Sequence, residues 1–143
     1  MNVTDKFQQY MNNRALSRVE IGEGRSLSLG FGDNNNRTFF KSYLRDYKEI
    51  ELGTYGQNWR VRTNSLHLTG DDLSVSEDYF YALIGELASV QLLNDSVALI
   101  FPSGQIDFLY NDDDDDEDFH LFTPSRDCWE WKDRIWTLYR KHY

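Results

Sequence analysis

The stretch that decides the fold is Ser17-Arg18-Val19-Glu20-Ile21-Gly22-Glu23-Gly24-Arg25-Ser26-Leu27-Ser28-Leu29-Gly30-Phe31. Apolar residues alternate with polar or small ones on both sides of a turn that contains two glycines. Alternation with a period of two is typical of a β-hairpin that buries one face. We therefore expect a hairpin at the start of an antiparallel sheet.

Short segments of the same kind continue along the chain, separated by turn residues. We predict a meander of strands at residues 47–52, 58–63 and 66–69, and further strands at 90–93, 97–101, 105–110 and 119–122. Residues 38–44 fit either a strand or a helical turn. Residues 128–139 fit a helical stripe or a terminal hairpin, and we favour the hairpin because Trp129 and Trp131 alternate with Glu130.

Two segments have helical spacing instead. In the first, Thr4 can cap a short helix that ends near residues 12–13 and carries the apolar residues Phe7, Tyr10 and Met11. The second runs from Glu77 to Ala88, begins with capping-box spacing from Ser74, and has apolar residues at i, i+3, i+4 and i+7: Phe80, Leu83, Ile84 and Leu87. We expect one α+β domain over residues 1–143, with a mainly antiparallel sheet, the N-terminal helix and this longer helix packed on one face.

Composition limits the possible functions. The chain has 143 residues, 40% hydrophobic and 15% aromatic, which is enough to bury one core. Its net charge of −9 disfavours direct binding to nucleic acid or to a membrane, because phosphate groups and anionic lipids repel it. Cys128 is the only cysteine, and neither a signal peptide nor a membrane-spanning stretch is visible, so we expect a cytoplasmic protein.

Most of the net charge lies in one run of seven acids that follows the strand predicted at 105–110. These acids are Asp112, Asp113, Asp114, Asp115, Asp116, Glu117 and Asp118, and without them the net charge would be −9 + 7 = −2. Like charges held this close repel one another and weaken the compact state. We interpret the run as a surface for a positively charged partner. The other interpretation is a solvated loop that keeps the protein soluble.

Residues that catalyse reactions lack supporting partners in the sequence. His67, His120 and His142 are not spaced as metal ligands, Cys128 has no adjacent base, and no Gly-x-Ser-x-Gly motif occurs. The acid run has neither the central glycine nor the alternation of an EF-hand loop. We therefore expect no catalytic residue, no metal site and no cofactor, and predict that the protein is not an enzyme.

Three segments resemble a family of small acidic bacterial proteins. They are residues 51–61, with Gly-Thr-Tyr followed by Trp-Arg, residues 70–72, and residues 115–124, where acids precede a Phe-His-Leu-Phe strand. The look of this family is similar to that of immunity proteins of polymorphic toxin and contact-dependent growth inhibition systems. The resemblance covers most of the chain after residue 25 and implies no catalytic residue.

The resemblance and the acid run point to the same partner, a basic protein toxin with nuclease activity, because a nuclease must be positive to approach phosphate. We expect the acid run to bind it together with Tyr110, His120 and Trp129, since aromatic residues supply the strongest contacts in interfaces. Tyr110 and Trp129 also fit a core position. The alternatives are a structural or regulatory subunit with a solvated acidic loop, or a small hydrolase.

Overall fold

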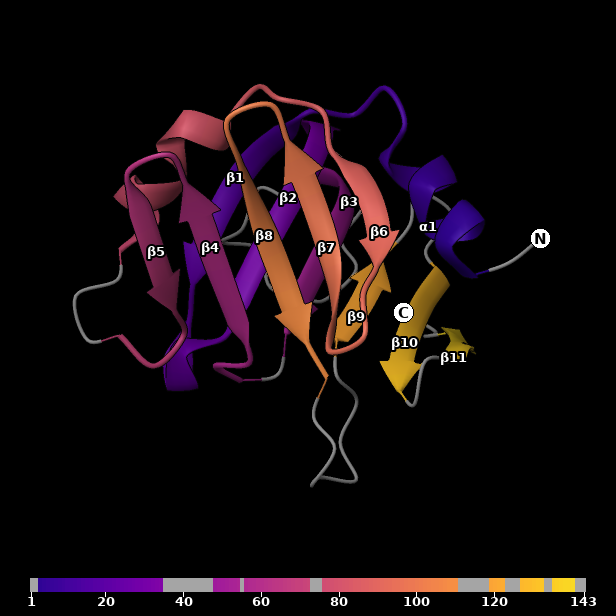
Figure 1. The fold of residues 1–143 in the computed structure, drawn as a ribbon. Helices are drawn as coiled ribbons and strands as arrows, with labels where there is room; N and C mark the ends of the chain where they lie inside the picture. The colour runs from indigo at the N-terminus through magenta and orange to yellow at the C-terminus, as the bar shows by residue number, and fades with distance from the viewer. Residues whose placement is uncertain are drawn as a thin grey trace.

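The computed structural model describes residues 3–34, 48–54, 56–72, 76–110, 119–122, 127–132 and 135–140. In this part of the chain two antiparallel sheets pack against each other around a shared core (Figure 1). The six-stranded sheet has the order β1-β2-β3-β9-β10-β11 and the five-stranded sheet the order β5-β4-β8-β7-β6. The expected antiparallel sheet structure is confirmed, although it is divided between two sheets.

The strands of the six-stranded sheet are β1 (Leu16–Ile21), β2 (Leu27–Asn34), β3 (Lys48–Thr54), β9 (Phe119–Phe122), β10 (Asp127–Lys132) and β11 (Ile135–Arg140). Those of the five-stranded sheet are β4 (Trp59–Thr63), β5 (Leu66–Thr69), β6 (Ser89–Leu92), β7 (Ser96–Phe101) and β8 (Gly104–Leu109). The helical segments are α1 (Val3–Met11) and two 3-10 helices, η1 (Glu23–Arg25) and η2 (Glu77–Leu83).

The hairpin predicted at residues 17–31 is confirmed as β1 and β2, with η1 in the turn. Leu27, Leu29 and Phe31 are fully buried, so the alternating residues of β2 face the core. The predicted N-terminal helix is confirmed as α1, whose Phe7 and Met11 also lie in the core. Figure 1 shows α1 beside β6, at one edge of the five-stranded sheet.

The three strands predicted at 47–52, 58–63 and 66–69 are confirmed, but the meander they were expected to form is wrong, because the first lies in a different sheet from the other two. β3 pairs with β2 and β9, whereas β4 pairs with β5 and β8. Ile50, Leu52, Trp59 and Val61 alternate along their strands and are buried. Alternation does not identify the neighbouring strand, which can come from anywhere in the chain. The chain therefore changes sheets between β3 and β4.

The longer helix expected at Glu77 to Ala88 is also wrong. The 3-10 helix η2 ends at Leu83, and Gly85 adopts a φ of +90°, which a continuing helix does not allow. The backbone beyond it pairs with β1, where the amide of Leu16 donates to the carbonyl of Glu86 at 3.0 Å. The helical spacing of this segment does not produce a long helix, because Gly85 stops the helix and the backbone after it pairs with the edge strand β1 instead.

The C-terminal hairpin is confirmed, since β10 pairs with both β9 and β11. Trp131 of β10 is buried in the core, with 1% of its surface exposed. No helix in the described ranges is long and apolar enough to cross a membrane. Residues 38–44 and the seven acids at 112–118 lie outside the described residues.

Candidate functional site

The residues that flank the acid run meet at one tryptophan. Tyr110 follows β8 and Phe119 begins β9, and both rings stack nearly parallel on Trp131. The ring centroids lie 6.3 Å apart for Tyr110 and 5.5 Å apart for Phe119, with interplanar angles of 15° and 11°. The amide of Tyr110 also donates to the carbonyl of Asp95 at 3.0 Å. Both flanks of the acid run are therefore fixed to the core.

Tyr110, His120 and Trp129 do not share one face of the sheet. Trp129 pairs with the buried Leu121, so both side chains lie on the core side of the six-stranded sheet. His120 lies on the opposite face, where a Cβ atom added to Gly53 would come within 2.8 Å of its Nε2. Tyr110 and Trp129 are half-buried against the core. The structure therefore separates His120 from the two aromatic residues.

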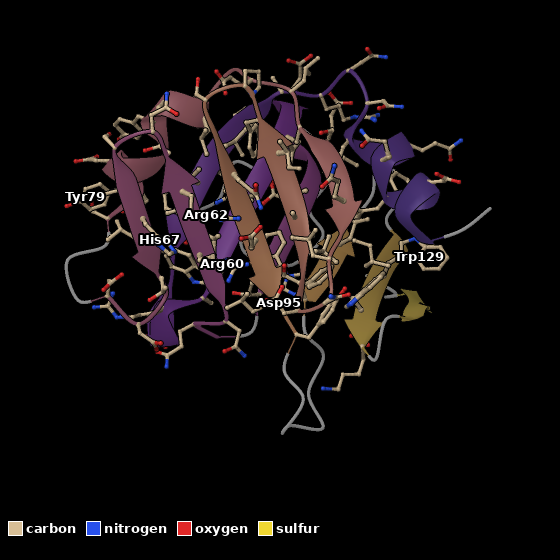
Figure 2. The ribbon with its side chains drawn as sticks, in the orientation of Figure 1. Arg60, Arg62, His67, Tyr79, Asp95 and Trp129 are labelled. Carbon is tan, nitrogen blue, oxygen red and sulfur yellow. The ribbon has the colours of Figure 1, made fainter. Side chains whose placement is uncertain are left out.

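An ion-pair network covers the outer face of the five-stranded sheet, with Arg60 and Arg62 on its exposed side (Figure 2). Its centre is Asp107, which is fully buried. Oδ2 of Asp107 accepts from Nε of Arg60 at 2.5 Å and from a terminal nitrogen of Arg62 at 3.3 Å, and Oδ1 accepts from Gln105 at 2.6 Å. A second acid, Asp95, lies 3.7 Å from Arg60.

This network holds neighbouring strands together, and its central carboxylate has no oxygen without a hydrogen-bond partner. Arg60 is paired with Asp107 across β4 and β8, so the ion pair joins neighbouring strands. Both oxygens of Asp107 already accept hydrogen bonds, and buried charges are tolerated when paired in this way. His67 on β5 lies opposite Arg62 on β4, and its side chain is exposed. We assign this face a structural role.

A second network covers the outer face of the six-stranded sheet. Glu51, only 4% exposed, forms an ion pair with Arg18 and accepts a hydrogen bond from the amide of Lys48 at 2.8 Å. Arg18 also bonds to Glu20 and Ser28, each at 2.9 Å. Burial raises the pKa of Glu51 above its ordinary value, although the charge of Arg18 and the Lys48 amide act in the other direction.

These contacts give no arrangement for catalysis or metal binding. The carboxylate of Glu51 is closed in by Arg18 and by the Lys48 backbone, and structural ion pairs perturb pKa values as active sites do. In the part of the chain that the structure describes, no three His, Cys, Asp or Glu side chains are grouped so as to hold a metal ion.

Sequence reasoning missed one surface. The segment predicted as the second half of a helix exposes large apolar residues beside an open groove of about 390 Å³. The groove is lined by Asn13, Ala15, Leu16, Ser17, Gly32, Asp33, Glu49, Ile84 and Gly85. Gly85, in the middle of an apparently perfect helical stripe, is the residue that could have revealed it, because glycine is unfavourable inside a helix.

Comparisons of this chain with protein-family models, with curated proteins and with solved structures give no match. The function is therefore inferred from the surfaces of the molecule itself.

Proposed function

We propose that this protein is a cytoplasmic binding protein of the immunity type, which neutralises a basic protein toxin with nuclease activity by covering its active surface. The observation that carries the proposal is the position of the acid run. Seven of its acids lie in the eight residues 111–118, and the residues on both sides of this segment stack on Trp131. A large share of the negative charge therefore has its attachment points at one place on the molecule.

Such a concentration of charge costs stability, since carboxylates closer than the Debye length of about 8 Å at physiological salt repel one another. A positively charged partner offsets this repulsion, because each carboxylate is attracted to the partner's charges. A compact patch of one sign also raises the rate at which an oppositely charged partner associates. A nuclease is such a partner, because its substrate-binding surface has to attract phosphate.

Aromatic residues near the acid run add contact area. Tyr110 and Trp129 are half-buried, so part of each residue is accessible to a partner. Trp131 is 1% exposed and supports the surface from below. The proposal therefore assigns direct contact to Tyr110, Trp129 and the acids. It gives His120 no direct role, because that side chain lies on the other face of its sheet.

The experiment compares three forms of the full chain. In the first variant, all seven acids from Asp112 to Asp118 are replaced by Asn or Gln, and in the second the six aspartates are replaced by Glu, which keeps the charge. The probe is the inactivated toxin domain that the proposal expects the neighbouring gene to encode. Lysozyme serves as a basic protein that is not a toxin.

The neutral variant should associate with the toxin domain at least about tenfold more slowly at low salt, while the Glu variant keeps the wild-type rate. The wild-type rate should fall steeply as salt rises through about 0.15 M. Cells that carry the neutral variant should lose protection against the active toxin. Equal association rates for the three forms would instead support a solvated loop on a structural or regulatory subunit.

A further inference from the structure

The exposed apolar surface missed by sequence reasoning is a single stretch of chain. We call it the ridge and define it by four side chains with the following exposed fractions: Tyr79 37%, Tyr81 64%, Ile84 40% and Leu87 52%. Single exposed apolar residues are common on protein surfaces, but four of them in one short segment concentrate apolar area in a way that favours interaction. Tyrosine is also among the residues that contribute most to binding energy in interfaces.

The ridge is held in place by hydrogen bonds from both ends. At its start, the carboxylate of Glu77 accepts from the amide of Ile21 at 3.2 Å. At its end, the amide of Gly85 donates to the carbonyl of Leu16 at 2.7 Å, and the carboxylate of Glu86 accepts from the amide of Ser103 at 2.9 Å. The apolar side chains are thus presented by a fixed backbone, which lowers the entropy cost of binding.

The groove begins where the ridge passes Ile84 and Gly85. Its apolar wall includes Ala15 and Ile84, and its polar side carries the carboxylates of Asp33 and Glu49. The amide of Asp33 donates to Glu49 at 2.9 Å, and this bond, supported by Arg14, lowers the pKa of Glu49 below its ordinary value. Glu49 therefore stays negative at neutral pH.

The ridge segment carries negative charge of its own. Residues 77–87 contain Glu77, Asp78 and Glu86 and no Lys or Arg. Among the described residues, Glu77 and Glu86 are engaged by hydrogen bonds but by no ion pair. Asp78 is bonded to the hydroxyl of Tyr81 and raises its pKa. A neighbour with apolar side chains and positive charges complements this surface.

We propose that the ridge and the groove form a docking surface for a basic protein, with a lysine or arginine side chain of that protein in the groove. The aliphatic stem of this side chain would lie along Ile84 and its charged end near Asp33, beside the Arg14–Glu49 ion pair, as long basic side chains do on amphipathic surfaces. A second copy of this chain is disfavoured as the occupant, because two chains of net charge −9 repel each other.

For the identity of the partner, this inference rests on the proposed function, because the basic toxin is the protein that supplies the charge. The ridge segment and Tyr110, the described residue before the acid run, lie at opposite ends of β8: Glu86 bonds to Ser103, just before β8, while Tyr110 follows its last residue (Figure 1). A six-residue strand spans about 20 Å, which is within the width of an ordinary protein interface. One toxin domain can therefore reach both surfaces.

The two surfaces should act on different steps. Removing charge from the acid run should mainly lower the association rate, whereas removing apolar contacts from the ridge should mainly raise the dissociation rate. The ridge variant carries Tyr81→Ser and Leu87→Ser, both at exposed positions. The control variant is Leu92→Ser, because Leu92 is 44% exposed on β6 outside the ridge.

The first test needs no toxin. A synthetic peptide of alternating lysine and leucine is titrated into the full chain whose seven acids at 112–118 are neutralised, and one of alternating glutamate and leucine serves as the control peptide. The ridge variant should bind the lysine peptide at least about tenfold more weakly than the Leu92→Ser control does. Equal affinities would overturn the inference. Self-association of the unmodified chain would also overturn the inference if the ridge variant abolished it, because a second copy would then cover the ridge.

The second test uses the toxin domain. The ridge variant should dissociate at least about tenfold faster with an unchanged association rate, the reverse of the acid-run variant. If the acid run controls association and the ridge variant dissociates like the wild type, the inference fails and the proposed function stands. If the toxin does not bind but the ridge binds the lysine peptide, the proposed function fails and the docking surface stands.

Discussion

The side chain of Gln8 pairs with the backbone of Val90 as a neighbouring strand would. Its Oε1 accepts from the amide of Val90 at 2.6 Å, and its Nε2 donates to the carbonyl of Ala88 at 3.3 Å. Since β6 is an edge strand, α1 closes with one glutamine an edge that could otherwise pair with another chain.

The Gln8→Ala variant should lose about 1 kcal/mol of the free energy of unfolding, because two backbone groups lose their partner. It should also aggregate more readily at high concentration, since the edge of β6 is opened. Urea denaturation and light scattering measure the two effects. Gln9→Ala, at an exposed position of the same helix, is the matched control and should change neither.

The residues Leu83 and Ile84 distinguish the observed backbone from the helix expected from the sequence. Leu83 is fully buried, whereas Ile84 is 40% exposed. Leu83→Asp should lower the free energy of unfolding by about 3 kcal/mol or more, and Ile84→Asp by less than about 1 kcal/mol. Chemical denaturation provides both values. Equal losses would mean that the two side chains share a buried helical stripe.

Gly104 should tolerate no side chain. A Cβ atom at this position would collide with the backbone carbonyl of Arg62, which β4 holds in place. Gly104→Ala should therefore cost about 1–3 kcal/mol of stability. At Gly56 an added Cβ atom has nothing within 4 Å, so Gly56→Ala should be nearly neutral in the same thermal denaturation measurement.

Acid should weaken the contribution of Glu49. Its pKa is lowered in the folded protein, first by the hydrogen bond from the Asp33 amide, so its contribution to stability is present above the ordinary pKa of 4.5 and is lost as the pH falls through the lowered value. Glu49→Gln should therefore differ from the wild type more at pH 7 than at pH 3. The measurement is urea denaturation at both pH values, and an equal difference would contradict the prediction.

A second variant separates the causes. Arg14 lies 3.2 Å from Glu49 and also lowers its pKa, through a hydrogen bond and through its charge. Arg14→Gln should therefore remove part of the pH dependence and leave the backbone hydrogen bond in place.

The local elements were largely predictable because their patterns are short-range. Leu27, Leu29 and Phe31 alternate with small or polar residues, and both the hairpin and the N-terminal helix follow from spacing alone. The partners of β3 were not predictable, since Leu52 pairs with Leu29 on one side and with Leu121, far along the chain, on the other. No local pattern encodes that choice.

The candidate binding surfaces were likewise only partly predictable from the sequence. Trp129 packs partly against the core, as one of the two sequence-based interpretations expected, and its role in an interface stays a prediction. The ridge was missed because Ile84 and Leu87 complete a helical stripe that only Gly85 interrupts. The acids from Asp112 to Asp118 stay a sequence-based prediction, since they lie outside the described residues.

The pairing of β3 with β9 also governs how this chain reaches its fold. Leu52 and Leu121 are 69 positions apart, and the whole five-stranded sheet lies between them in sequence. Pairings this distant are slow to form, because the loop has to close before its contacts contribute. During synthesis β3 keeps an open edge until β9 emerges, so the newly made chain depends on its own late strand to avoid pairing with another molecule.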